Sequence, residues 1–339
     1  MNAPKDGSAG DHGIDLLFML RAVRRAMQAT RIVQASPQLD SLAKDDRSPV
    51  TIADWASQAV VALELGPVLA QTPLVGEEEA AALRAPESGA LLAQVVDAVS
   101  RALGRPVKRQ ECLAAIDAGR GAPNSKAFFT LDPVDGTKGF LRRQQYAISL
   151  ALIEGGVPTY GVVGCPNLPA EGGDYDRPDP VGCLAFAVKG GGAWVERNHG
   201  EPQQLHVRDW RLGAPVRACE SVEAAHSKQD LAAEMLALIG GAGTPARLDS
   251  QCKYVVVARG GADAYLRLPV KADYREKIWD HAAGALIAAE AGAKVCDVEG
   301  FPLDFGRGRE LSANRGVLAG HPAIVDRLVS AYARLKLRG

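Results

Sequence analysis

The ten residues 131–140, LDPVDGTKGF, constrain this chain more than any other stretch. They follow the apolar run AFFT, and they carry two carboxylates, Asp132 and Asp135, separated by a proline and a valine. An apolar run of this kind is typical of a buried strand, and Pro133 fixes the backbone between the two acidic residues. The sequence therefore predicts two carboxylates at the end of a strand. For these two residues alone, an Asx-turn is the competing interpretation.

The bulk composition limits the class of protein. At 339 residues, the chain has the length of two domains rather than of one simple core. Its 47% hydrophobic and 23% charged residues are ordinary for a soluble globular protein. The net charge of −1 provides no global field that would draw the chain to nucleic acid or to a membrane. Any anionic ligand must then be held by a local site.

Cysteine usage and the chain start indicate the compartment. The six cysteines are scattered, without a C-x-x-C pair or a zinc-like histidine spacing, which indicates reduced thiols. The start MNAPKDGSAGDHG lacks the basic and apolar stretches of a signal peptide. No apolar run approaches the ~20 residues that a membrane span needs. We therefore expect a cytoplasmic protein.

The order of apolar patterns predicts an N-terminal α+β domain, residues 1–205, and a C-terminal α/β domain, residues 206–339. In the first, two helices precede a short strand in TPLVGEEE, two further helices and two hairpins. The acidic loop 171–180 lacks the spaced glycine and final glutamate of a calcium loop and is predicted to be a solvated insertion. In the second domain, strand and helix alternate: PVRACE, a helix near 227–240, YVVVARG, AYLRLPV, the helix DHAAGALIAAEAG, two short strands and a closing helix.

Four acidic features lie where a predicted element begins or ends. Asp54 stands at the start of the second helix, where capping is the competing interpretation. Glu77 follows the strand in TPLVGEEE, the aspartate pair follows the AFFT strand, and Asp280 lies in KIWDHAAG. Sheet edges of this kind are where α/β proteins gather site residues. Carboxylates brought together repel unless cations neutralise them, and oxygen-only ligands select hard ions, Mg²⁺ above all.

The residues that follow Asp135 add a phosphate site to this picture. Gly136 and Thr137 start a predicted helix, whose free N–H groups and positive dipole suit a phosphate. The carbonyl of Val134 is a further candidate oxygen ligand. Metal and phosphate sites side by side indicate phosphoryl chemistry.

These motifs resemble the inositol monophosphatase superfamily of lithium-sensitive, magnesium-dependent phosphomonoesterases. DPVDGT at 132–137 matches the signature D-P-[IV]-D-G-T, WDHAAG at 279–284 matches W-D-x-A-A-G, and GEE stands at 76–78. Blocks such as SPVTIADWASQ, LDSQCKY and YLRLPVK are similar to the 3′(2′),5′-bisphosphate nucleotidase subgroup. The likeness runs from about residue 14 to about residue 320. It implies the layered αβαβα sandwich of the inositol monophosphatase and sugar phosphatase type.

The resemblance also implies a role for each matching residue. Asp54 and Thr137 would orient and deprotonate the attacking water. The implied ligands of about two or three Mg²⁺ ions are Glu77, Asp132, the Val134 carbonyl, Asp135 and Asp280. The implied substrate-binding residues are Gly136, Thr137, His226, Ser250, Lys253, Arg267 and Asp280. Among these, Lys253 and Arg267 carry the charge that a second phosphate needs.

The implied activity is hydrolysis of the 3′-phosphate of 3′-phosphoadenosine 5′-phosphate to AMP by a metal-activated water, as in sulfur assimilation. The 5′-phosphosulfate analogue is a further candidate substrate. An inositol mono- or bisphosphatase with the same metal site and a non-catalytic phosphonucleotide sensor stay as alternatives. EAGA at 290–293 and LRRQQYA at 141–147 depart from the subgroup's usual residues and bear on substrate preference alone. By analogy with the subgroup we expect a monomer.

Overall fold

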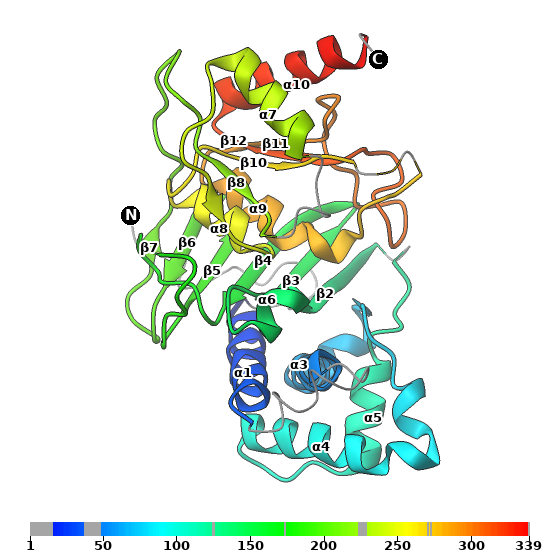
Figure 1. Ribbon diagram of the computed structural model, residues 1–339. Helices are drawn as coiled ribbons and strands as arrows, with labels where there is room; N and C mark the ends of the chain where they lie inside the picture. The colour runs from blue at the N-terminus through cyan, green and yellow to red at the C-terminus, as the bar shows by residue number, and fades with distance from the viewer. Residues whose placement is uncertain are drawn as a thin grey trace.

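The computed structural model describes residues 16–36, 49–123, 126–172, 174–222, 229–269, 271 and 273–337. In this part of the chain, helices and two sheets stack in the order αβαβα (Figure 1). The layered sandwich implied by the sequence resemblance is confirmed. Below the first sheet lie α1 (Leu16–Gln34), α3 (Pro49–Leu65), α4 (Gly89–Leu103) and α5 (Arg109–Asp117). Between the sheets lie α8 (Cys252–Ala258) and α9 (Ala282–Glu290), and α7 (Gln229–Ile239) and α10 (Pro322–Lys336) cover the second sheet.

The two sheets follow one another along the chain. The first has the order β1-β2-β3-β4-β5-β6-β7 and is antiparallel apart from the parallel pair β1–β2. Its strands are β1 (Leu74–Gly76), β2 (Ala127–Asp135), β3 (Ala147–Glu154), β4 (Val157–Cys165), β5 (Cys183–Val188), β6 (Ala193–Glu196) and β7 (Gln203–Gln204). The second has the order β11-β12-β10-β8-β9. Its strands are β8 (Ala218–Glu220), β9 (Ala246–Arg247), β10 (Ala264–Arg267), β11 (Lys294–Cys296) and β12 (Val317–Gly320).

Alternation along the strands builds three apolar layers. Phe129 packs with the lower helices, whereas its neighbour Phe128 faces the middle helices. In the second sheet, Tyr265 faces the middle helices and Leu266 faces the outer ones. Because successive side chains of a strand point to opposite faces and both faces are covered, the strands read as continuous apolar runs. The middle apolar layer takes residues from both sheets.

Two local predictions from the sequence are wrong. The run YVVVARG, which the alternating pattern made a strand, forms most of α8, and every residue from Cys252 to Ala258 is buried. A helix buried on all sides has no polar face, so its sequence reads like a buried strand. Asp54 is not at a helix start, because α3 begins at Pro49 and carries Asp54 in its second turn. Proline suits the first turn of a helix, and capping is therefore excluded for Asp54.

The change from one sheet to the other falls between β7 and β8, within residues 205–217. The helix α9 follows this change in sequence, yet it packs on β3, β4 and β5 of the first sheet. The division into two domains near residue 205 stays a prediction. In the described part of the chain, no helix combines the length and apolar character that crossing a membrane would require.

Candidate active site

One cavity of about 310 Å³ collects most of the residues that the sequence singled out. It lies where the end of β2 meets the short helix α6 (Thr137–Leu141), the segment before α8, and the 3-10 turn η5 (Ile278–Asp280). Of the described residues, Asp54 is buried nearby in α3 but does not line the cavity. His226 lies outside the described residues. The predicted residues that line the cavity are Glu77, Asp132, Val134, Asp135, Gly136, Thr137, Ser250, Lys253, Arg267 and Asp280.

A bulge in β2 brings the two aspartates to the same face of the sheet. Asp132 pairs with Ser149 of β3, and Asp135 pairs with Ala147, so three steps along β2 match two steps along β3. In a regular strand, residues three apart face opposite sides, and the extra residue of the bulge corrects this. Proline has no N–H to lose from the pairing, so Pro133 is tolerated at this point.

Close packing fixes the end of the cavity at the start of α6. Gly136 has a φ of 88°, and a Cβ there would lie 2.9 Å from the Cβ of Ser250. Ser250 itself has a φ of 69°, which is uncommon for a residue with a side chain and marks a backbone held by its surroundings. The N–H of the next residue, Gln251, donates to Asp135 Oδ2 at 2.6 Å. The segment before α8 is thus held against the end of β2.

The carboxylates of the cavity raise one another's pKa. Burial, Glu78 and Asp135 raise the pKa of Glu77 to about 7. Burial and Asp135 likewise raise the pKa of Asp280 to about 7. The pKa of Asp132 lies well above its ordinary value, because the group is buried and the other cluster carboxylates surround it. The cluster therefore carries negative charge that the nearby side chains do not neutralise.

Two cations, Lys253 and Arg267, line the same cavity as the carboxylates. Lys253 is buried, donates to Ser221 Oγ at 3.2 Å, and lies 5.1 Å from the ring centroid of Tyr265. Burial and the neighbouring Arg267 lower the pKa of Lys253. Arg267 Nε donates to Glu276 Oε1 at 3.2 Å. The charge that interrupts the apolar strand β10 is therefore paired.

The donor set of the cluster fits a hard divalent cation. Glu77, Asp132, Asp135 and Asp280 offer carboxylate oxygens, and the lining backbone of Val134 adds a carbonyl. All are oxygen donors, and their raised pKa values express the repulsion that a bound cation would relieve. The arrangement therefore fits Mg²⁺ better than a thiolate- or imidazole-seeking ion.

A neighbouring group of possible ligands is engaged in hydrogen bonds instead. Glu276, Asp280 and His281 lie close enough to share an ion. However, Glu276 Oε2 is 3.3 Å from His281 Nε2, and the other ring nitrogen of His281 is 2.8 Å from the hydroxyl of Tyr254. Both ring nitrogens of His281 are thus occupied, and Glu276 also accepts from Arg267. We assign this group to the support of Arg267 and leave Asp280 to the carboxylate cluster.

The raised pKa values predict that the metal-free protein loses stability as the pH rises. The pKa of Glu77 is about 7 in the folded chain against an ordinary 4.5, and that of Asp280 is about 7 against 3.8. Each group binds its proton more tightly in the folded than in the unfolded chain, so stability falls as the pH rises from about 4 to about 7. At ~1.4 kcal/mol per pKa unit, the penalty at neutral pH is largest for Asp280, whereas solvent screening reduces it for the exposed Glu77.

Glu77→Gln tests this expectation, because it removes one such group. In EDTA, we expect its free energy of unfolding in urea to exceed that of the wild type at pH 7.5 and the difference to shrink at pH 5. Because Glu77 is exposed to solvent, screening keeps the difference below the full value of the pKa shift. Saturating Mg²⁺ should reverse the order at pH 7.5, since the wild-type site retains all its ligands. An equal gain at both pH values would show that charge repulsion is not the cause.

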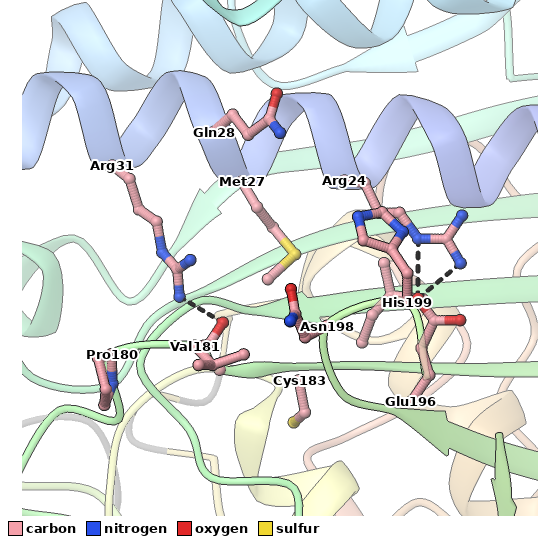
Figure 2. A pocket seen from close by; sticks show the side chains of 12 residues that line it. Arg24, Met27, Gln28, Arg31, Pro180, Val181, Cys183, Glu196, Asn198 and His199 are labelled. Carbon is pink, nitrogen blue, oxygen red and sulfur yellow. Dashed lines mark hydrogen bonds and ion pairs between the residues drawn. The ribbon is translucent and has the colours of Figure 1, made fainter. Parts of the chain in front are cut away.

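Two other cavities among the described residues hold none of the predicted site residues. One of about 240 Å³ lies between α1 and the strands β5 and β6 (Figure 2). Its arginines are engaged, because Arg24 Nε donates to Glu196 Oε1 at 2.8 Å and Arg31 Nη2 donates to the carbonyl of Val181 at 2.6 Å. Another, of about 550 Å³, lies beside β6 and β7. The volume of a cavity therefore does not identify the candidate site. The carboxylates and cations that line the 310 Å³ cavity together do.

Sequence reasoning missed residues that support the site through contacts distant in sequence. Gln251 is buried, and its side chain donates to the carbonyl of Trp279 at 2.8 Å and accepts from the N–H of Gly284 at 2.9 Å. It therefore joins Asp135 to the segment that carries Asp280. The block LDSQCKY contained this residue, but only the cationic and hydroxyl side chains of the block were singled out. Other lining residues that were missed are Lys138, Asp249, Tyr265 and His281.

Comparisons with known proteins show the family of the chain. The model of the inositol monophosphatase family matches residues 18–333. A 3'(2'),5'-bisphosphate nucleotidase of Schizosaccharomyces pombe is 41% identical, and the match covers 93% of each chain. One of Emericella nidulans is 42% identical over 93% of this chain and 96% of its own. Among solved structures, CysQ from Bacteroides thetaiotaomicron has a TM-score of 0.62 at 21% identity, covering 90% of this chain and 96% of its own, which supports the fold alone.

Proposed function

The chain belongs to the inositol monophosphatase family, and from this premise we propose that it hydrolyses the 3′-phosphate of 3′-phosphoadenosine 5′-phosphate to give AMP and phosphate. Its relatives named 3'(2'),5'-bisphosphate nucleotidase share 38–42% identity over most of the chain. The observation that carries the proposal is one cavity that combines a carboxylate cluster with two cations. A substrate with two separate phosphates meets both requirements. The 5′-phosphosulfate analogue is a second candidate substrate.

The family is metal-dependent, and we propose about two or three Mg²⁺ ions for this site. When bound, Mg²⁺ neutralises phosphate charge and makes water more acidic. The proposed ligands are Glu77, Asp132, Asp135, Asp280 and the Val134 carbonyl. The chain's own contribution is to hold these oxygens in place: the bulge in β2 sets the aspartate pair, and the N–H of Gln251 orients Asp135.

Asp54 and Thr137 are the proposed pair that orients the attacking water and accepts its proton. Burial, Glu78 and Glu77 raise the pKa of Asp54 well above its ordinary value, which makes it a stronger base than an exposed aspartate. Thr137 is exposed at the first position of α6 and lines the cavity. The backbone N–H groups at the start of this helix are the proposed donors for the phosphate that reacts.

The second phosphate of the substrate is assigned to Lys253 and Arg267, with Ser250 as a hydroxyl donor. Arg267 presents a planar group suited to phosphate oxygens, and Glu276 holds it in one orientation. His226 stays a proposed contact to the nucleotide. We further propose a monomer that acts in the cytoplasm; its six cysteines are free thiols, which suits a reducing compartment.

Phosphate release with Mg²⁺ tests the proposal on four substrates. These are 3′-phosphoadenosine 5′-phosphate, its 5′-phosphosulfate analogue, inositol 1-phosphate and inositol 1,4-bisphosphate, with Asp135→Asn as the blank. We expect the nucleotides to be preferred over inositol 1-phosphate by about 100-fold in kcat/KM, since its single phosphate leaves the cationic side without a partner. Inositol 1,4-bisphosphate, which has two phosphates but no base, shows how much of the preference comes from the second phosphate alone. A preference for inositol 1-phosphate would retain the metal site and reject the substrate. Tight nucleotide binding without turnover would favour the sensor alternative.

A further inference from the structure

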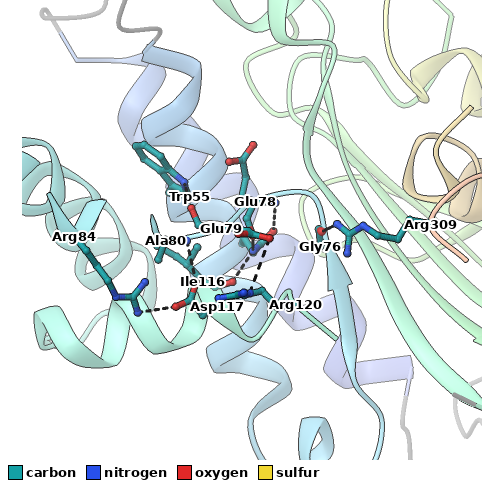
Figure 3. A network of polar contacts seen from close by, with 11 residues as sticks. Trp55, Gly76, Glu78, Glu79, Ala80, Arg84, Ile116, Asp117, Arg120 and Arg309 are labelled. Atoms are coloured by element: carbon teal, nitrogen blue, oxygen red, sulfur yellow. Dashed lines mark hydrogen bonds and ion pairs between the residues drawn. The ribbon is translucent and has the colours of Figure 1, made fainter. Parts of the chain in front are cut away.

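The geometry points to Arg309 as a positioning residue that fixes Glu77 and Asp280 relative to each other. These are the two proposed metal ligands that lie farthest apart in sequence, and the inference rests on the metal site of the proposed function. Arg309 contacts the residue before each ligand. Arg309 Nη2 donates to the carbonyl of Gly76 at 2.6 Å, and Glu77 is the next residue in the chain (Figure 3).

The second contact is made at the other ligand. The guanidinium carbon of Arg309 lies 4.7 Å from the ring centroid of Trp279, which directly precedes Asp280. An arginine stacked over an indole gains a cation–π contact and fixes the plane of its guanidinium. That plane also directs the donor to Gly76. The same side chain is therefore held by one ligand segment while it holds the other.

The backbone around Arg309 strengthens the connection to Asp280. Its carbonyl accepts from the N–H of Ile278 at 3.1 Å, and the N–H of Leu311 donates to the carbonyl of Glu276 at 2.8 Å. Between these two bonds, Lys277 and Glu310 pair as an antiparallel bridge. Arg309 is thus fixed to the segment of Asp280 by backbone hydrogen bonds and by its contact with Trp279. Its side chain also reaches across to β1.

The segment of Glu77 needs this contact because β1 has only three residues. On the side of α3, Gln58 Nε2 donates to the carbonyl of Glu78 at 2.6 Å, and Gln58 Oε1 accepts from the N–H of Glu78 at 3.1 Å. Gly76 also donates to the carbonyl of Gly119 at 2.8 Å. These bonds tie Glu77 to the lower helix layer. Of the contacts described for this segment, the one from Arg309 ties it to the part of the chain that carries Asp280.

A residue that fixes two ligands should set metal affinity more than it sets substrate affinity. Groups that orient metal ligands typically contribute 10–100-fold to metal affinity or activity. We expect Arg309→Met to lower the affinity for Mg²⁺ by roughly 10–100-fold. At saturating Mg²⁺, the KM for the nucleotide should stay within about threefold, because Lys253 and Arg267 are unchanged. A residue that only stabilised the fold would lower the melting temperature without lowering the Mg²⁺ affinity of the folded protein.

The matched control is Arg307→Met. Arg307 lies two residues away in the same loop, is mostly exposed, and pairs with Asp304 at 2.6 Å. The variant removes the same charge from the same loop without touching either ligand segment. It should bind Mg²⁺ as the wild type does.

The experiment is a calorimetric titration of substrate-free protein with Mg²⁺ alone, alongside thermal unfolding by circular dichroism. Arg309→Lys keeps the charge and loses the planar group, and we expect several-fold weaker binding; this variant decides the question if Arg309→Met does not fold. If either folded Arg309 variant binds Mg²⁺ as the wild type does, or if Arg307→Met loses as much Mg²⁺ affinity, the role of Arg309 is wrong. The proposed metal site would still stand. Failure of the wild-type protein to bind Mg²⁺ would overturn the proposed metal site and the inference with it.

Discussion

Asp132→Asn should stop phosphate release and at the same time make the metal-free protein more stable. The expected fall in kcat is on the order of 10³-fold or more, since a metal ion contributes several kcal/mol of transition-state stabilisation and each ~1.4 kcal/mol is a factor of ten. The gain in stability has a separate cause. Burial and the carboxylates of Glu77, Asp135, Asp280 and Asp54 raise the pKa of Asp132, so a neutral amide relieves repulsion.

The control is the same substitution at a buried aspartate whose charge is satisfied. Asp263 accepts from Arg208 Nη2 at 2.6 Å and from the N–H of Arg217 at 2.7 Å, and it lies outside the cavity. Asp263→Asn should lower the melting temperature in EDTA and leave kcat near the wild-type value. If Asp132→Asn also lowers the melting temperature in EDTA, charge repulsion is not what dominates the empty cluster.

Arg267→Gln should separate bisphosphates from monophosphates. For 3′-phosphoadenosine 5′-phosphate, we expect kcat/KM to fall by roughly 100-fold, because the second phosphate loses a charged, planar partner and Glu276 loses its cation. For inositol 1-phosphate, which has a single phosphate, the change should stay within a few fold. The ratio of the two kcat/KM values is the measurement, so a general loss of active protein cancels.

Arg275→Gln is the matched control for this prediction. Arg275 lies next to Glu276, is half-buried, does not line the cavity, and donates to the carbonyl of Tyr274 at 3.0 Å. Removing its charge should leave the ratio of the two substrates unchanged. An equal fall for both substrates in Arg267→Gln would assign Arg267 to the reacting phosphate instead of the second one.

Local sequence was enough to predict the positions of most cavity residues. Gly136 and Thr137 do start a helix, and the aspartate pair does end a strand, because these features depend on neighbouring residues. The bulge that aligns Asp132 with Asp135 depends on pairing with β3, which no single segment encodes. The position of Asp54 in the second turn of α3 was missed because the helix begins five residues earlier, at Pro49.

The supporting contacts could not be predicted from local pattern. Arg309 and Gly76 are 233 residues apart, and only the tertiary fold brings them together. The valine-rich run of α8 was misinterpreted because burial on both sides removes the periodicity that separates helix from strand. The role of Gln251 could not be predicted from the sequence, since a glutamine is equally common on an exposed surface. Only the structure shows that its side chain joins two parts of the site.

The shared middle layer of helices has a consequence for synthesis. The first sheet is complete at Gln204, but its upper face is covered by α9, which begins at Ala282. A ribosome must therefore make the whole intervening segment before that face can be covered. During this interval the nascent chain presents an apolar sheet surface, with Phe128 and Val163 among its buried residues. The order of elements in this chain therefore leaves that surface uncovered until α9 has been made.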